Sequence, residues 1–403
     1  MDKNNNSIHN NTLALTIGIL SISFLMSVSN AVSGTVPLME KHFSSISQAS
    51  IEMLVVIPTG GVLIGTVVSG LISNYLGKKN TVLCGLIISL ISGVLPAFLY
   101  NYPCLFMSRL FFGVGAGIFT PLSVSYITDV FAEEQRNKLL GWRNSVGAIG
   151  DSLMLFIAGF LINISWHTTY LVFLALLIPI VLVQLFVPKE LDNVESTSDG
   201  NLEEVSQEQS KKKPTTNIKV IKLAMIFLFC QLFYSAISLK FATYLVQNHI
   251  GTAADATRIF GVLVFCSIIS GIIFEKIVKV SGKFTVAVFD VLTAAVMMLI
   301  PFTSSIPLLL VLVLVAGFCN GIINPALTAR MVAYSPEGSM NLTTSIIIIG
   351  INIGSLVSPY FFQYLGKILN SSGAAAMIFW GGALYILLAL YDLYTVKKDN
   401  LTL

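Results

Sequence analysis

The sequence has few charged residues for its length. Asp, Glu, Lys and Arg make up 11% of the 403 residues, whereas hydrophobic residues make up 55%. Because soluble globular chains carry about 25% charged residues, this composition excludes an ordinary soluble protein. We expect the chain to be solvated by lipid.

Cysteine and histidine are also scarce, and the net charge is small. The five cysteines are scattered without a metal-ligand or disulfide spacing, and the four histidines lie at or near predicted loops. No nucleophile–base spacing and no ATP site is visible. The net charge of +3 comes from dispersed basic residues, which argues against nucleic acid as a partner. We therefore expect neither an enzyme nor a cofactor or metal site.

Long apolar runs are abundant. A helix needs about 20 apolar residues to cross a bilayer, and runs this long are too continuous for barrel strands. The polar start, MDKNNNSIHNNT, leads into a first run that we interpret as a retained span. The predicted fold class is an all-α integral membrane protein of twelve spans, near residues 13–37, 51–75, 81–99, 104–127, 141–163, 169–187, 219–247, 256–278, 284–303, 307–333, 342–366 and 374–396.

One connection is much longer than the others. Residues 188–218 contain NVESTSDGNLEEVSQEQSKKKP, which has no apolar periodicity. This segment predicts a cytoplasmic linker between two six-helix bundles, residues 1–187 and 219–403. The linker is interpreted as a solvated tether, although its KKKP can also contact anionic lipid.

The basic residues are distributed asymmetrically. With both termini in the cytoplasm, only Lys41, Arg258 and Lys367 of the 23 Lys and Arg residues fall outside, and Arg109 and Lys240 fall within spans. The other 18 lie in or beside cytoplasmic loops, as the positive-inside rule requires. We therefore expect a cell-membrane protein with both termini cytoplasmic.

The two halves share a glycine and proline frame. GVGAGIFTP in the fourth span matches GFCNGIINP in the tenth at a shift of 204 residues, and Gly150 corresponds to Gly350. A phosphate loop would need a strand before a helix, so these glycines are better interpreted as helix-packing points. The matched positions are Gly113, Gly117, Pro121, Gly317, Gly321 and Pro325. Repeated, interrupted spans favour a transporter with a site at the interface of the halves and pseudo-two-fold symmetry.

Several motifs resemble the major facilitator superfamily over nearly the whole chain. GLISNYLGKK after the second span is similar to the family's loop signature, with Asn74 where aspartate is usual and Tyr75 where a base is usual. RLFFGVGAG resembles the signature often found in proton-coupled exporters, and ITDVFAEEQRNKLLG and GIIFEKIVKVSGK are similar to further family patterns. The resemblance implies a 12-helix, efflux-type secondary transporter. MLFIAG stands where drug antiporters carry a glycine-proline element, which leaves that subclass open.

The same resemblance implies a cytoplasmic gate. Its residues would be Gly70, Asn74, Gly77, Lys78, Lys79, Asp129 and Arg136. Asn74 accepts a hydrogen bond but carries no charge, so the gate is expected to be latched differently from that of the family. Asp129 and Arg136 are open to two interpretations, a gate ion pair or simple helix caps.

Charges within the spans need an explanation because burial in lipid is costly. Asp151 is predicted near the midplane, and Arg109 in the outer half can reach it. Asp151 is assigned to proton coupling with Arg109 as its modulator; a static ion pair and substrate binding are the alternatives for Asp151, and snorkelling is the alternative for Arg109.

Polar residues within spans are candidates for a substrate cavity. The set is Asn30, Gln231, Lys240, Asn320, Asn324 and Asn352, each of which can instead form an interhelical hydrogen bond or, for Lys240, snorkel. The aromatic residues Phe24, Phe112, Phe233 and Tyr234 favour a moderately hydrophobic solute.

The leading hypothesis is proton-coupled efflux of a small organic drug or metabolite by alternating access, in a monomer whose partners are the substrate, protons and the lipid bilayer. Two alternatives stay open. One is metabolite uptake by symport or uniport, and the other is a non-transporting sensor or lipid-handling protein of the same fold.

Overall fold

The computed structural model describes residues 13–24, 28–337, 339–371 and 373–398, except 189–214. Its elements in these ranges are helical, and no strand occurs among them. The predicted linker, residues 188–218, therefore lies mostly outside the described residues. Because lipid offers no partner to a backbone amide, helices that satisfy their own hydrogen bonds are the expected solution for such apolar runs.

The chain forms two compact units, each held together by contacts among its own residues. The first comprises Met1–Val32 and Leu54–Thr197, and the second comprises Ser33–Met53 and Ser198–Leu403. The second unit thus includes a short segment from the N-terminal half of the sequence, residues 33–53, together with the C-terminal half. The predicted division at residues 188–218 assigned residues 33–53 to the N-terminal bundle, whereas the contacts assign them to the second unit.

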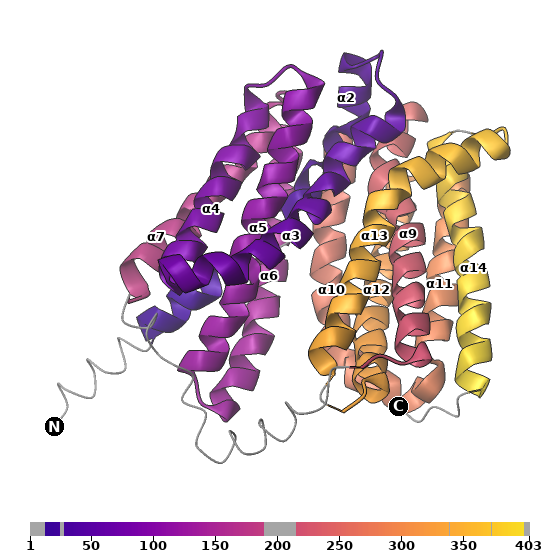
Figure 1. Cartoon of the computed structure of the whole chain (residues 1–403). Helices are drawn as coiled ribbons and strands as arrows, with labels where there is room; N and C mark the ends of the chain where they lie inside the picture. The colour runs from indigo at the N-terminus through magenta and orange to yellow at the C-terminus, as the bar shows by residue number, and fades with distance from the viewer. Residues whose placement is uncertain (1–12, 25–27, 189–214, 338, 372, 399–403) are drawn as a thin grey trace. The chain divides into compact units, whose positions relative to one another are not determined.

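The first unit contains a helical segment over residues 13–21 and five longer helices. These are the remainder of α3 (Gln48–Leu76), then α4 (Lys78–Val94), α5 (Tyr102–Val130), α6 (Glu133–Leu161) and α7 (Leu177–Phe186), with η2 (Leu95–Ala97) and η3 (Thr168–Leu176) between them. α4 packs along α5 and η3, and Figure 1 shows α4 and α5 running side by side.

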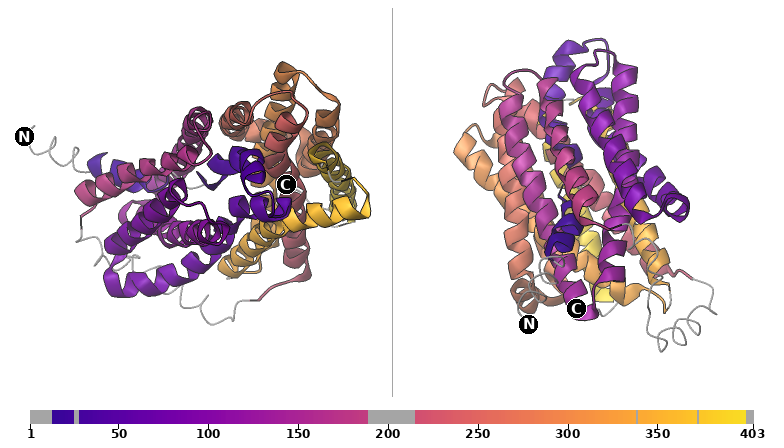
Figure 2. Two further views of the ribbon diagram at one scale, coloured as in Figure 1. Left: turned by 90° about the horizontal axis from the view of Figure 1, so that it is seen from above. Right: turned by 90° about the vertical axis from the view of Figure 1, so that its left-hand side faces the viewer.

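The second unit contains η1 (Val28–Thr35) in part, α2 (Val36–His42) and six long helices. These are α9 (Ile218–Gln247), α10 (Ala253–Ser281), α11 (Thr285–Leu299), α12 (Ile306–Tyr334), α13 (Met340–Ile368) and α14 (Ala374–Lys398), with η5 (Gly282–Phe284) and η6 (Ile300–Phe302) at the ends of α11. α9 packs against α13 and α14, α11 packs against α12 and α14, and α10 packs against α12. Seen from above in Figure 2, these helices appear as a bundle viewed end-on.

Local sequence signals set several helix ends. The Asn217 side chain accepts from the Val220 amide at 2.8 Å and caps α9, and a reciprocal capping box joins Thr252 and Asp255 at the start of α10. Proline stands in the first turn of α2, α5 and α12, where its missing N–H costs nothing.

Ten helical stretches among the described residues are long and apolar enough to cross a membrane. One of them, Ala253–Phe302, includes both the predicted eighth and ninth spans. The predicted first span, residues 13–37, contains residues outside the described ranges. Many membrane-spanning helices are therefore established, and the number twelve stays a prediction.

Glycines allow close helix packing in both halves of the sequence. A Cβ on Gly113 of α5 would lie 2.0 Å from the Pro58 carbonyl oxygen of α3, and one on Gly117 would lie 2.3 Å from that of Val62. In the other half, Gly317 and Gly321 of α12 meet α10 in the same way, at Leu263 and at Ser267 and Ser270. Pro121 and Pro325 lie inside α5 and α12, one turn beyond the second glycine of each pair.

Candidate functional site

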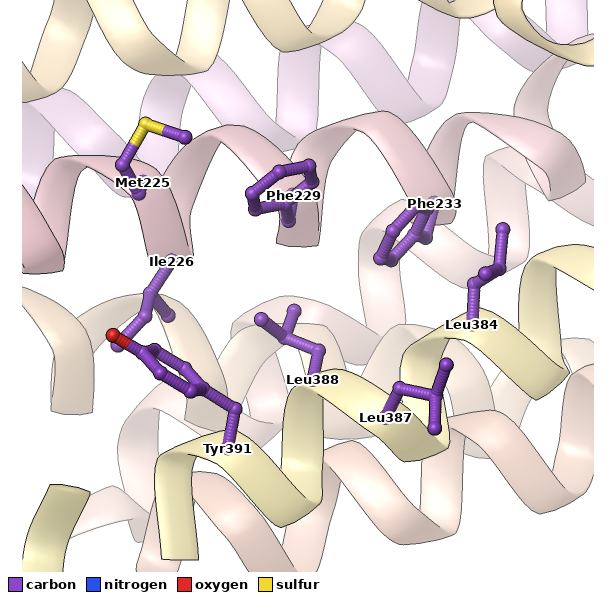
Figure 3. A pocket seen from close by; sticks show the side chains of 8 residues that line it. All are labelled: Met225, Ile226, Phe229, Phe233, Leu384, Leu387, Leu388 and Tyr391. Atoms are coloured by element: carbon purple, nitrogen blue, oxygen red, sulfur yellow. The ribbon is translucent and has the colours of Figure 1, made fainter. Parts of the chain in front are cut away.

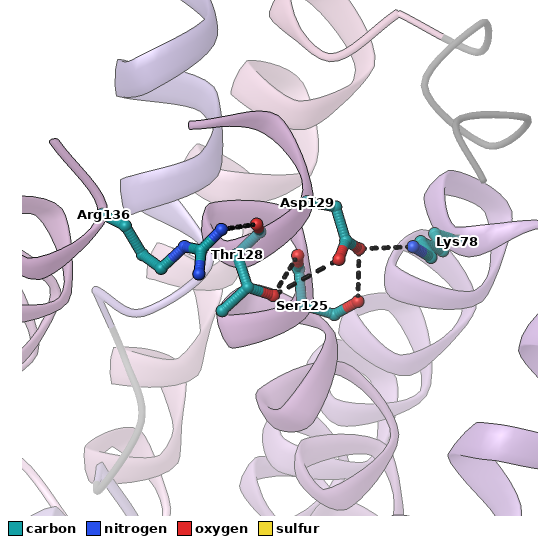
Figure 4. Close-up of polar contacts among 5 residues, drawn as sticks. All are labelled: Lys78, Ser125, Thr128, Asp129 and Arg136. Carbon is teal, nitrogen blue, oxygen red and sulfur yellow. Dashed lines mark hydrogen bonds and ion pairs between the residues drawn. The ribbon is translucent and has the colours of Figure 1, made fainter. Parts of the chain in front are cut away.

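A polar cluster lies where α4 begins and α5 ends (Figure 4). The Lys78 ammonium is 2.5 Å from the Asp129 carboxylate, and both side chains are partly exposed. The Ser125 hydroxyl donates to the same carboxylate oxygen at 2.8 Å, and the Thr128 hydroxyl contacts the other oxygen at 3.3 Å. The structure thus brings Lys78 and Asp129, two of the predicted gating residues, into one ion pair.

The neighbouring predicted gating residues surround this pair. Arg136 of α6 donates to the Thr128 carbonyl at 2.9 Å, and Lys79 donates to the Gln184 carbonyl of α7 at 3.0 Å. Gly77 precedes α4 with a φ of 77°, a left-handed conformation that favours glycine. The cluster therefore ties the ends of α4, α5, α6 and α7 together.

Asn74 and Gly70 lie on the last turns of α3. Asn74 is exposed, and a Cβ placed on Gly70 would have no neighbour within 4 Å. Their part in a gate stays a prediction.

Arg109 is fully buried in the first unit. Its Nε donates to the Leu54 carbonyl of α3 at 3.1 Å, and its guanidinium carbon lies 5.0 Å from the Phe112 ring centroid and 5.4 Å from that of Phe173. The Tyr170 ring centroid is 5.8 Å away. Aromatic faces stabilise a desolvated cation, and a side chain with no exposure does not snorkel.

Asp151 is also buried, with 8% of its surface exposed, in the middle of α6. Directly before it, Gly150 approaches the Phe24 carbonyl so closely that a Cβ would lie 1.7 Å from the oxygen. A Cβ on the corresponding Gly350 of α13 would lie 2.8 Å from the Ala224 carbonyl oxygen of α9. The backbone next to Asp151 is therefore packed closely against Phe24, and the pairing of Asp151 with Arg109 stays a prediction.

A small polar cavity lies inside the second unit. Its volume is about 30 Å³, which accommodates roughly two water molecules. Three of the predicted cavity residues, Gln231, Asn320 and Asn324, line it together with Phe227, Cys230, Tyr234, Ile323, Ile351 and Tyr385. The Asn324 amide donates to the Asn320 carbonyl at 3.1 Å. The structure thus collects polar side chains from α9 and α12 at one place in an apolar bundle.

The other predicted cavity residues lie elsewhere or are not described. The Asn352 amide donates to the Ile348 carbonyl of its own helix at 2.8 Å. The side chain of Asn30 lies outside the described residues. These two positions in a substrate cavity therefore stay predictions.

Lys240 forms a buried ion pair with Glu52. The two charged atoms are 2.5 Å apart, and the side chains are 3% and 0% exposed. Both residues belong to the second unit, where Glu52 is in the segment 33–53. Lys240 therefore does not snorkel, and a role in binding substrate stays a prediction for it.

Glu40 of α2 is a further carboxyl near Lys240. Burial raises the pKa of Glu40, while the Lys240 charge and a hydrogen bond from Gln48 oppose that shift. Glu40 thus competes with Glu52 for the same ammonium group, and the competition weakens when Glu40 is protonated.

An apolar pocket of about 390 Å³ lies between α9 and α14 (Figure 3). Phe229 and Phe233 line it from α9, and Leu384, Leu388 and Tyr391 line it from α14. Phe233 is one of the aromatic residues that the sequence singled out, and here it packs among apolar side chains of the bundle.

Several buried charges escaped the sequence reasoning. Glu52, Asp290, Arg330 and Asp392 are each at most 2% exposed. A scan for every ionisable residue in an apolar run would have found Asp290, which stands in FDVLTAAVMML. Glu52, Arg330 and Asp392 fall near predicted span ends, where charges are ordinary. Among the described residues, no three His, Cys, Asp or Glu side chains come together as metal ligands.

Comparison with known families gives one match across most of the chain. The sequence model of the Major Facilitator Superfamily matches residues 16–296. Quinolone resistance protein NorA of Staphylococcus aureus is 23% identical over 326 residues, which cover 78% of this chain and 79% of NorA.

Two other curated relatives match only locally. An uncharacterized MFS-type transporter, EfpA of Mycobacterium tuberculosis, is 28% identical over 33% of this chain, and the match spans 24% of EfpA. Multidrug resistance protein 3 of Bacillus subtilis is 29% identical over 27% of this chain and 22% of its own length.

Solved structures share the fold. A D-xylose-proton symporter has a TM-score of 0.70 at 18% identity, with 96% of this chain and 97% of that chain covered. A POT family transporter has a TM-score of 0.75 at 12% identity, with 95% and 96% covered. At these identities the likeness concerns the fold alone.

Proposed function

Because the chain belongs to the major facilitator superfamily, we propose that this transporter exports a small organic molecule in exchange for protons. The observation that carries the proposal is the polar cavity lined by Gln231, Asn320 and Asn324 within an apolar bundle. Polar side chains in lipid-embedded helices are costly unless they have partners, and a cavity that holds water supplies them.

The relatives support the direction of transport. NorA, which aligns with most of the chain, is named a quinolone resistance protein, and a multidrug resistance protein matches locally. We extend export to this chain, and with it a moderately apolar, drug-like substrate. The aromatic residues Phe227 and Tyr234, which lie beside the amides, favour such a substrate.

Proton coupling is assigned to Asp151, with Arg109 as its electrostatic modulator. Both are buried in the first unit, where a carboxyl exchanges protons only if a conformational change exposes it. The Lys78–Asp129 pair serves as the cytoplasmic latch, because ion pairs at helix ends form and break more easily than those in the interior. Alternating access then proceeds by rocking of two helix bundles.

The proposal is tested with purified protein in proteoliposomes that contain a pH-sensitive dye. Ethidium and a fluorescent quinolone serve as probe substrates. We expect either probe to move protons in the wild type, and Asp151→Asn to reduce this proton movement to background because asparagine cannot be ionised. The control is Asp255→Asn, which changes a partly exposed carboxyl in the capping box of α10 and should behave as the wild type. If Asp151→Asn moves protons with the probe at the wild-type ratio, Asp151 is not the carrier.

A second function, uptake by symport or uniport, is favoured by one feature of the chain. MLFIAG, residues 154–159 of α6, replaces the glycine-proline element that drug antiporters carry. In the same vesicles, uptake predicts that an inward proton gradient drives the probe inward together with protons, whereas export by exchange predicts movement in opposite directions.

A further inference from the structure

Three charged side chains meet inside the second unit, away from the predicted site residues. Asp290 of α11, Arg330 of α12 and Asp392 of α14 are 0%, 2% and 0% exposed. The Arg330 Nη1 donates to the Asp392 carboxylate, and its Nη2 donates to the Lys283 carbonyl at 3.1 Å. Arg330 is thus the hydrogen-bond partner of one buried carboxyl, Asp392, and lies within electrostatic reach of the other, Asp290.

Asp290 has no hydrogen-bond partner among the described residues. Neither of its carboxylate oxygens receives a donor, although both are buried. An ionised carboxylate without a partner is too costly to keep in a helix bundle within lipid. The charges balance if Arg330 neutralises Asp392 and Asp290 holds a proton.

The ionisable neighbours of Asp290 come from α9, α12 and α14. α14 contributes Asp392 and Tyr385, α12 contributes Arg330 and Cys319, and Cys230 of α9 lies within electrostatic reach. Arg330 is the only cation in this set of described neighbours. When Asp290 loses its proton, Arg330 is the group available to stabilise the new charge.

The neighbours of Asp290 line two small cavities of the unit. Cys230 and Tyr385 line the polar cavity that Gln231 and Asn324 also line. Arg330 lines a second cavity of about 10 Å³ together with Lys219, Lys222 and Thr395, where α9 begins and α14 ends. The charge pattern predicts that this end of the unit faces the cytoplasm.

We propose that Asp290 is a second proton carrier, which holds a proton while Arg330 pairs with Asp392 and releases it when Arg330 turns to Asp290. The proton leaves the Asp290 carboxyl for water on one side, and Asp392, which Arg330 no longer neutralises, takes up a proton from the other side, so the cluster keeps one proton and no other bond changes. This inference rests on the proposed proton-coupled transport and adds a carrier in the C-terminal half. Arg330 is the positioning residue, since it acts through the two carboxyls.

The first test measures the proton itself, without a substrate. Infrared spectra of the lipid-reconstituted protein at neutral pH show the C=O stretching band of protonated carboxyl groups. We expect Asp290→Asn to remove one such band from the wild-type spectrum. Asp392→Asn should remove the same band, because Arg330 is then free to pair with Asp290 and the proton is lost. Asp255→Asn, which changes a partly exposed carboxyl, is the control and should leave the band intact.

The second test asks whether this proton moves during transport. With ethidium as the probe, Asp290→Asn vesicles should carry fewer protons for each ethidium than wild-type vesicles. An unchanged band in Asp290→Asn would overturn the protonated state. A band that persists at every pH at which the protein stays folded, together with a wild-type proton ratio in Asp290→Asn, would overturn the carrier role.

Failure of the proposed function gives a different result. If wild-type vesicles move neither ethidium nor a quinolone with protons, proton-coupled export of these probes is wrong. The infrared comparison of the wild type, Asp290→Asn and Asp392→Asn still decides whether Asp290, the carboxyl group that Arg330 does not neutralise, holds a proton.

Discussion

Glu52 and Lys240 illustrate how much a single buried charge depends on its partner. Their side chains are nearly inaccessible and lie 188 positions apart in the sequence. Removing one partner of a buried ion pair leaves the other charge uncompensated, whereas replacing both by apolar groups is often tolerated. The pair therefore makes the packing of α9 against the segment 33–53 depend on charge.

We predict that Glu52→Gln lowers the free energy of unfolding by about 3 kcal/mol, because the Lys240 ammonium loses its carboxylate. Thermal unfolding in detergent measures the loss. Lys240→Met in the Glu52→Gln background should recover most of it, since no buried charge remains. If the double variant is less stable than Glu52→Gln, the pair itself is not what stabilises this contact.

Glu40→Gln is the matched comparison for this pair. Glu40 is near the same ammonium, but burial raises the pKa of Glu40, which makes its ionised form less favourable. Its substitution should therefore cost less than that of Glu52. A larger loss in Glu40→Gln would identify Glu40 as the main partner of Lys240.

Helix packing in both halves depends on the same glycine frame. Gly113 and Gly117 face α3, two helices earlier in the chain, and Gly317 and Gly321 face α10, again two helices earlier. Small residues spaced by four lie on one helix face and let two backbones approach. The repeat found in the sequence thus corresponds to equivalent packing contacts within each unit.

We predict that Gly113→Ala destabilises the protein by about 2 kcal/mol, because the new Cβ would lie 2.0 Å from the Pro58 carbonyl oxygen and must push α3 and α5 apart. Thermal unfolding in detergent gives the size of the loss. Gly141→Ala is the control, since a Cβ there meets nothing within 4 Å and alanine favours a helix. Equal stability of the two variants would contradict close packing at Gly113.

The orientation of the molecule in the membrane is a prediction from its charge pattern. The basic residues concentrate at one end of the predicted spans, and few fall at the other. Lys279 at the end of α10 and Lys367 at the end of α13 are expected on opposite sides, inside and outside respectively.

We predict that, in a background without native cysteines, Lys367→Cys reacts in intact cells with a maleimide that cannot cross membranes, whereas Lys279→Cys does not. Both should react once the cells are permeabilised, which controls for accessibility of the two positions. Labelling of Lys279→Cys alone in intact cells would reverse the predicted topology.

For much of the candidate site, the sequence predicted which residues take part but not which of them lie together. Sequence reasoning selected Gln231, Asn320 and Asn324 because they are polar within apolar runs, and the structure places them around one cavity. It also selected Lys78 and Asp129, which form an ion pair. The Arg330–Asp392 pair was missed because each residue alone looks like an ordinary charge near a helix end.

The membrane class, the helices and the glycine frame are evident in the amino-acid sequence. These follow from local composition and spacing, because lipid requires apolar runs long enough to span it and helices that satisfy their own backbone hydrogen bonds. Which charges neutralise one another is visible only in the folded protein: Glu52 pairs with Lys240, Asp392 pairs with Arg330, and Asp290 pairs with neither cation. Such pairing depends on how each helix is rotated and packed against helices far away in the chain, which local spacing does not specify.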